Sequence, residues 1–120
     1  MKISQEALLS DLIERTKKVL NNAEQYTQLT LEQLNFKKST ESWSILECME
    51  HLNLYGDFYL PEIENKMASS KSNSATIFKS GLLGNYFAKS MLPKEQLNKM
   101  KTFKDKNPIG SNLDKTTIDR

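Results

Sequence analysis

The sequence predicts an all-α fold, an incomplete up-down helical bundle of two long antiparallel helices, a shorter apolar segment and an irregular C-terminal tail. Two observations predict this class. Apolar side chains recur at helical spacing through residues 4–29 and again through residues 43–67, which is the pattern of amphipathic helices that dock on a core. Each stretch is longer than about five turns, so we expect the two helices to pack lengthwise against each other.

The composition indicates a single soluble domain over residues 1–120. Hydrophobic residues make up 38% of the chain and charged residues 27%, and no apolar run approaches the roughly 20 residues that cross a bilayer. The N-terminus lacks the apolar stretch of a secretory signal. The single cysteine cannot form an internal disulfide, which suits the reducing cytoplasm. We therefore expect a cytoplasmic protein that does not bind membranes.

Charge is divided unevenly along the chain. Residues 1–67 hold 7 Lys and Arg against 11 Asp and Glu, a net charge of −4, while residues 68–120 hold 10 against 4, a net charge of +6. Opposite charges attract these two parts to each other or to a neighbouring chain. The lysines are dispersed and have few aromatic residues between them, so we expect no nucleic-acid partner.

Residues 4–29 are predicted to form the first helix, because their apolar positions cover an arc of about 140° at roughly 100° per residue. Residues 30–41 are expected to connect it to the second helix. A short turn at residues 31–34 should place its leucines under the core, and residues 37–42 are typical of a polar surface loop. The apolar positions of the first helix are Leu8, Leu9, Leu12, Ile13, Thr16, Val19, Leu20 and Ala23.

Residues 43–67 carry the clearest helix signals. Ser44 and Glu47 have the spacing of a capping box, and Trp43 precedes the cap, where a large ring packs on the first turn. Pro61 is expected to bend the helix without ending it, because the apolar positions keep their phase beyond it. The predicted core face is Ile45, Met49, Leu52, Tyr59, Ile63 and Met67. The side chains predicted to point into solvent are Glu47, Glu50, Asp57 and Glu64.

Three segments follow the second helix. Residues 68–75 have the composition of a flexible linker. Residues 77–92 place apolar side chains all around a helical wheel and contain two glycines, which leaves their helicity open. We expect this apolar segment, which with the linker covers residues 68–92, to be buried between elements or against a partner. The Lys-rich tail, residues 93–120, is expected to be extended and poorly packed, with the start of another helix after Ser111.

His51 is the only histidine and lies at the edge of the predicted core face, on a line with Cys48 and Tyr55. Considered from its neighbours alone, it is most simply a partly buried histidine that is hydrogen-bonded to another group. We expect Cys48 to be a small buried hydrophobe and not a nucleophile. The sequence holds no phosphate-binding glycine loop, nucleophile elbow or Cys-x-x-Cys motif.

Residues 34–51 resemble the DinB-like (YfiT-like) family of four-helix bundles, and the resemblance continues through residues 54–61. It implies a metal site, since family members typically hold a divalent ion with one histidine of the second helix and a histidine pair of the fourth. Some members are transferases, isomerases or hydrolases. The matching residues are Trp43, Ser44, Ile45, Glu47, His51 and Leu52. Only His51 carries over as a ligand, and the chain resembles a member truncated before its last two helices.

The resemblance implies a lineage of metal-dependent transferases or hydrolases, acting on an unidentified small molecule with zinc or nickel held by His51. A catalytic zinc site needs about three protein ligands. Without downstream helices, we expect this chain to bind metal weakly and to be inactive, although a symmetric dimer would supply a second His51. The alternative is a non-catalytic helical interaction module, a homo-oligomer that self-associates through the exposed apolar stripes of its helices.

Overall fold

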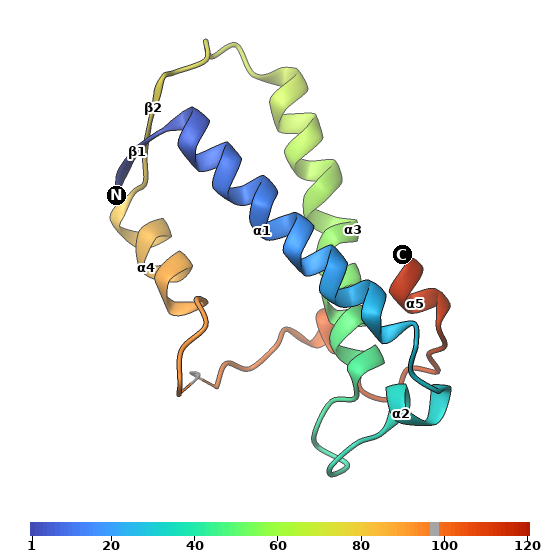
Figure 1. The fold of residues 1–120 in the computed structure, drawn as a ribbon. Helices are drawn as coiled ribbons and strands as arrows, with labels where there is room; N and C mark the ends of the chain where they lie inside the picture. The colour runs from blue at the N-terminus through green and yellow to red at the C-terminus, as the bar shows by residue number, and fades with distance from the viewer. Residues whose placement is uncertain (97–98) are drawn as a thin grey trace. The chain divides into compact units, whose positions relative to one another are not determined.

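The computed structural model describes residues 1–96 and 99–120 (Figure 1). These residues are mostly helical, which confirms the expected all-α class; the DinB-like bundle remains a prediction. Residues 97 and 98 of the expected tail lie outside the described ones. The elements in chain order are β1 (Lys2–Ser4), α1 (Gln5–Tyr26), α2 (Leu31–Asn35), α3 (Ile45–Ser69), β2 (Ile77–Lys79), α4 (Leu82–Ser90), the 3₁₀ turn η1 (Lys104–Lys106) and α5 (Thr116–Asp119).

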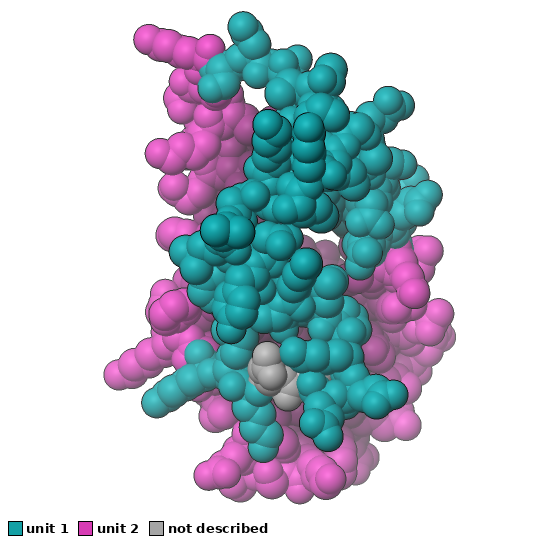
Figure 2. Space-filling view, turned by 90° about the vertical axis from the view of Figure 1, so that its left-hand side faces the viewer, with its two compact units in different colours: residues 1–17, 72–101 teal, residues 18–71, 102–120 magenta. Residues whose placement is uncertain are grey.

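The chain forms two compact units, coloured separately in Figure 2. Unit 1 consists of Met1–Lys17 and Ser72–Lys101, and unit 2 consists of Lys18–Lys71 and Thr102–Arg120. Each unit therefore combines segments that are far apart in the sequence. No helix of the described chain is long and apolar enough to cross a membrane.

A two-stranded antiparallel sheet holds unit 1 together, with Ile3 of β1 opposite Phe78 of β2. Backbone hydrogen bonds extend the pairing on both sides of these strands, from the amide of Gln5 to the carbonyl of Thr76 (2.8 Å) and from Ser80 to Met1 (3.0 Å). The sequence analysis does not predict this sheet. Strands of three residues are too short to show the alternation by which strands are recognised.

The apolar segment of residues 77–92 is divided between β2 and α4, so it is helical only over Leu82–Ser90. None of the residues of α4 is buried. Leu82 is 94% exposed and Tyr86 is 67% exposed. The expectation that other elements of the chain bury this segment is therefore wrong.

The first long helix, α1, begins and ends close to its predicted limits. Ser4 caps it, since its hydroxyl accepts a hydrogen bond from the amide of Ala7 (3.1 Å). None of its residues is buried, and the apolar stripe predicted for it is exposed, with Leu12 48% and Leu20 59% accessible. Both long helices exist as expected, while their lengthwise packing remains a prediction.

Helix α2 contributes the first fully buried side chain of unit 2, Leu34. Thr30 and Gln33 form a capping box, with the Gln33 amide donating to the Thr30 hydroxyl (3.2 Å) and the Thr30 amide to the Gln33 side chain (2.9 Å). This cap turns α2 so that Leu34 is fully buried while Leu31 remains 47% exposed. The expectation that both leucines of this turn contribute to the core is thus confirmed for Leu34 and wrong for Leu31.

The second long helix, α3, starts at the predicted cap, where the Ser44 hydroxyl accepts from the Glu47 amide (3.0 Å). The Glu47 carboxylate pairs with Lys37 (3.0 Å) instead of completing the capping box, and its side chain is buried. The helix continues through Pro61 to Ser69, as predicted.

The packed face of α3 differs from the predicted one beyond Met49; the predicted core positions Ile45 and Met49 are half-buried. Leu46 is fully buried together with Leu34, Ser44 and Pro108. The predicted core positions in the rest of the helix are at least half exposed; these are Leu52, Tyr59, Ile63 and Met67. The physical reason is that α2 and the C-terminal segment both contact α3 on its other side. The C-terminal segment is held there by hydrogen bonds and ion pairs, which the spacing of hydrophobic residues does not reveal.

The C-terminal segment, residues 102–120, contacts α3, so the expectation of a poorly packed tail is wrong for these residues. Residues 93–96 and 99–101 are exposed and form no helix or strand, as expected. Pro108 and Thr117 are buried. The helix expected after Ser111 begins at Thr116, where the Asp114 carboxylate accepts from the Thr116 amide (2.9 Å). The turn η1 and helix α5 both contact α3.

Candidate functional site

His51 lies in the second turn of α3, between two aromatic rings. The ring of Trp43 is 4.8 Å away between centroids and tilted by 49°, and the ring of Tyr55 is 4.9 Å away with its edge toward the imidazole. Tyr55 is one turn further along the helix, so helical spacing alone places it there. The imidazole is half-buried and held on both sides by these rings.

The third partner of His51 comes from the C-terminal segment. Its Nδ1 atom lies 3.0 Å from the backbone carbonyl oxygen of Lys106. A carbonyl oxygen only accepts, so Nδ1 carries the proton and donates it. In the neutral ring the lone pair is then on Nε2. The same arrangement occurs at metal-binding histidines, whose second nitrogen donates to a carbonyl or carboxylate, and at purely structural ones.

The side chain of Lys106 continues the contact between η1 and α3. Its ammonium lies 5.4 Å from the centre of the Phe58 ring, within the range of a cation–π interaction. It also pairs with the Asp105 carboxylate (3.0 Å), and the hydrogen bond from Lys106 lowers the pKa of Asp105. Lys106 therefore binds α3 through both its backbone and its side chain.

Cys48 is one turn before His51 and is exposed, so the expected buried position is wrong. Partial desolvation of the sulfur and the negative charge of Glu47 both raise the pKa of the Cys48 thiol. A thiol with a raised pKa is mostly protonated at neutral pH, whereas nucleophiles and metal ligands are thiolates. The environment of Cys48 thus disfavours both roles.

The donor set around His51 does not fit a chelating metal site within one chain. Within residues 1–96 and 99–120 there is no group of three or more His, Cys, Asp or Glu residues that could hold a metal ion. A catalytic zinc site needs about three such ligands, and a single imidazole binds a divalent ion weakly.

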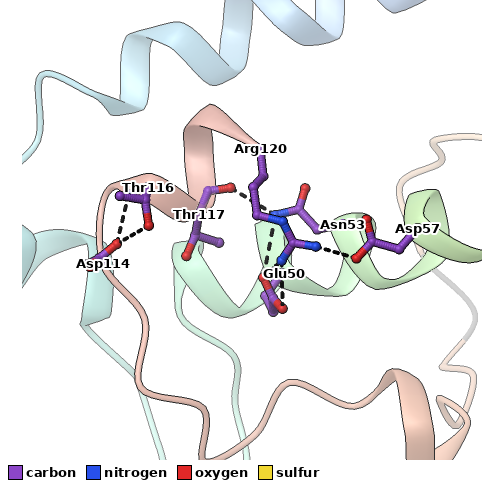
Figure 3. Close-up of polar contacts among 7 residues, drawn as sticks. All are labelled: Glu50, Asn53, Asp57, Asp114, Thr116, Thr117 and Arg120. Atoms are coloured by element: carbon purple, nitrogen blue, oxygen red, sulfur yellow. Dashed lines mark hydrogen bonds and ion pairs between the residues drawn. The ribbon is translucent and has the colours of Figure 1, made fainter.

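Two of the four acidic residues predicted to point into solvent, Glu50 and Asp57, bind the C-terminal segment (Figure 3). Arg120 places one guanidinium nitrogen 3.5 Å from both oxygens of Glu50 and donates another hydrogen bond to Asp57. Between them, the Asn53 side chain donates to the carbonyl of Thr117 (2.9 Å). The prediction is therefore wrong for Glu47 and Glu50, which are buried or half-buried, while Glu64 and Asp57 are exposed as expected, Asp57 with Arg120 as its partner.

Two further side-chain contacts attach the segment to the rest of unit 2. Asn35 of α2 donates to the carbonyl of Leu113 (3.4 Å), and Lys115 donates to the carbonyl of Thr27 (3.0 Å). Sequence reasoning missed these residues because their partners are backbone carbonyls, which every residue carries. For the docking of the C-terminal segment as a whole, Asn53 was the one signal in the sequence. Asparagine is a poor helix former, and its side chain readily forms hydrogen bonds with backbone groups.

The uncovered side of α3 forms a second feature of unit 2. We call Leu52, Tyr59, Ile63 and Met67 the α3 apolar face. Tyr59 stacks on Tyr55 at 5.9 Å and meets the edge of Phe58 at 5.1 Å. An open concavity of about 510 Å³ lies on this side of the helix. Its lining residues are Phe58, Tyr59, Glu62, Ile63, Lys66, Met67 and Ser70.

Comparison with known proteins gives no match to a family model, to a curated protein or to a solved structure. The DinB-like resemblance, the metal role of His51 and the homo-oligomeric state therefore remain predictions. The structure brings His51 together with Trp43, Tyr55 and the Lys106 carbonyl.

Proposed function

We propose that this protein is a non-catalytic helical interaction module whose α3 apolar face binds a second copy of the chain. The observation that carries the proposal is the exposure of that face. All four of its side chains are at least 51% accessible, although helical spacing places them in one stripe. A stripe of this kind is typical of a helix that docks on another surface.

The energetics favour covering this stripe. Fully burying a Leu, Ile or Met side chain is worth about 1.5–3 kcal/mol. In a symmetric dimer the same patch is buried on both chains, so each side chain counts twice. The polar side of α3 is already occupied by the C-terminal segment, which leaves the apolar side available for a second chain.

Sedimentation or light scattering over a range of protein concentrations tests the proposal. We expect the wild type to be dimeric or larger, and Ile63→Asp to be monomeric because it places a charge in the apolar stripe. Asn65→Asp adds the same charge about 160° around the helix from Ile63 and should behave as the wild type. A wild type that stays monomeric, or equal behaviour of the two variants, contradicts the proposal.

A second candidate function keeps the role that the DinB-like resemblance gives to His51, as a ligand in a lineage of metal-dependent transferases or hydrolases. It is favoured by the Nδ1 donation to Lys106, which leaves the Nε2 lone pair for zinc or nickel. Since one described chain supplies a single imidazole, the remaining ligands must come from elsewhere, such as the His51 of a second copy.

Zinc titration of the untagged protein, followed by calorimetry, tests this candidate. We expect weak binding that disappears in His51→Ala. His51→Gln keeps a donor for the Lys106 carbonyl and should lose zinc binding while retaining the fold, which separates the two roles. Identical zinc isotherms for the wild type and both variants would exclude His51 as a ligand.

A further inference from the structure

Two opposite charges line the concavity beside the α3 apolar face. Glu62 and Lys66 are both exposed. Neither has an ion-pair partner among the described residues, whereas Glu47, Glu50 and Asp57 of the same helix all do. An unpaired acid and base on one apolar surface are the composition of a self-complementary interface.

We infer that two copies of α3 meet antiparallel, with Glu62 of each copy beside Lys66 of the other. This inference rests on the self-association proposed above and adds its orientation and register. It commits to one occupant for the concavity, a second copy of this chain, on the ground of charge complementarity.

Helix geometry brings these side chains to one contact surface. At about 100° per residue, Glu62 and Lys66 are only 40° apart around the axis, and Lys66 is 60° from Ile63. At about 1.5 Å per residue, the two charges are separated by roughly 6 Å along the axis. They therefore form a row beside the apolar stripe, with the acid toward the N-terminal end and the base toward the C-terminal end.

Two-fold symmetry then decides the orientation. An antiparallel pair with its axis level with residue 64 places each Glu62 at the height of the second copy's Lys66, so that two ion pairs form. The two Ile63 side chains then differ in height by only about 3 Å, and Tyr59 comes to within about 3 Å in height of the second copy's Met67. A parallel pair has its two-fold axis along the helices, so the charged rows of the two copies lie on opposite sides of the contact and neither ion pair forms.

Charge reversal on the full-length chain tests the register. Glu62→Lys leaves two bases, and Lys66→Glu leaves two acids, on the contact surface of each copy. We expect the dissociation constant of each variant alone to rise about tenfold or more, measured by sedimentation at low salt. An equimolar mixture of the two variants should associate as a heterodimer, because the bases of one face the acids of the other. The double variant E62K/K66E should associate as the wild type does.

Glu64→Lys is the matched control, since Glu64 is exposed and lies about 160° around the helix from both Glu62 and Lys66. It makes the same change in net charge as Glu62→Lys and should leave association unchanged. Raising the salt concentration should reduce the difference between the single variants and the wild type, because exposed charges are screened.

The outcomes separate this inference from the proposed function. A monomeric wild type overturns the self-association itself. A dimeric wild type whose association is unaffected by Glu62→Lys and Lys66→Glu overturns only the antiparallel register. Restoration by mixing the two variants supports it, because no change in folding or in net charge of a single chain produces that result.

Discussion

Truncating Leu46 tests which side of α3 is packed. Leu46 is 0% exposed, whereas Leu52 of the same helix is 57% exposed. Hydrophobic spacing assigns Leu52 to the core face and does not assign Leu46 to it. The pair Leu46→Ala and Leu52→Ala therefore compares one chemical change at two positions for which the sequence and the structure give opposite expectations.

The expected magnitudes follow from burial. Leu-to-Ala substitutions at fully buried sites cost about 2–5 kcal/mol. Leu46 belongs to a small core close to the surface, and such a core can partly collapse around a cavity. We therefore expect Leu46→Ala to lower the free energy of unfolding by about 2–3 kcal/mol. Complete burial of a leucine is worth about 1.5–3 kcal/mol. Since Leu52 is less than half buried, Leu52→Ala should cost about 1 kcal/mol or less.

Urea unfolding followed by the fluorescence of Trp43, the only tryptophan, measures both values. The ring of Trp43 lies against His51 at the start of α3, so its emission reports the packing of unit 2. The measurement belongs at a protein concentration low enough to avoid association, because Leu52 is part of the α3 apolar face. If Leu52→Ala costs as much as Leu46→Ala, the packed side of α3 is misassigned.

Three further outcomes follow from the contacts of unit 2. Asn53→Ala removes the donor to the Thr117 carbonyl and should destabilise the docking of residues 102–120 by about 1 kcal/mol, measured as faster amide exchange in that segment, while Asn65→Ala should not. Hydrogen bonds from the hydroxyl and amide of Thr116 lower the pKa of Asp114. The stability that these bonds give α5 is therefore complete above the unfolded pKa of about 4 and is lost as the pH falls through the lower folded pKa. Amide exchange of α5 should rise as the pH falls through this window, and Asp114→Asn should remove the pH dependence. Burial and the charge of Glu47 raise the pKa of Cys48, so its alkylation should reach full rate only at a pH above that of an unstructured cysteine, and Glu47→Gln should lower that pH without abolishing the shift.

The sequence predicted the features that depend on neighbours along the chain. The cap at Ser44 and the passage of α3 through Pro61 depend on residues within about one turn, and they occur as expected. The limits of α1 are also close to prediction because its pattern is long and regular.

The features that depend on distant partners were missed. The strands β1 and β2 are three residues each and pair across more than half of the chain. The site around His51 needs the carbonyl of Lys106, 55 residues further on. A backbone carbonyl belongs to every residue, so no residue type in the tail signals that contact. The ion pairs of Glu50 and Asp57 with Arg120 were missed for the same reason, because acidic residues on a polar face are usually solvated without a partner.

The two sides of α3 use different kinds of interaction. On the polar side, directional hydrogen bonds to carbonyls and to Arg120 select one segment and one register, but each contributes only about 0.5–1.5 kcal/mol net. Apolar burial is the larger source of stability, and among the described residues only Leu34 and Leu46 are hydrophobic side chains with no exposure. A chain with so little internal apolar burial gains stability when its α3 apolar face is covered. Apolar contact is non-directional, so in the proposed dimer the charges of Glu62 and Lys66 define the register. The proposed association of α3 with a second copy therefore predicts that the stability of the fold rises with protein concentration.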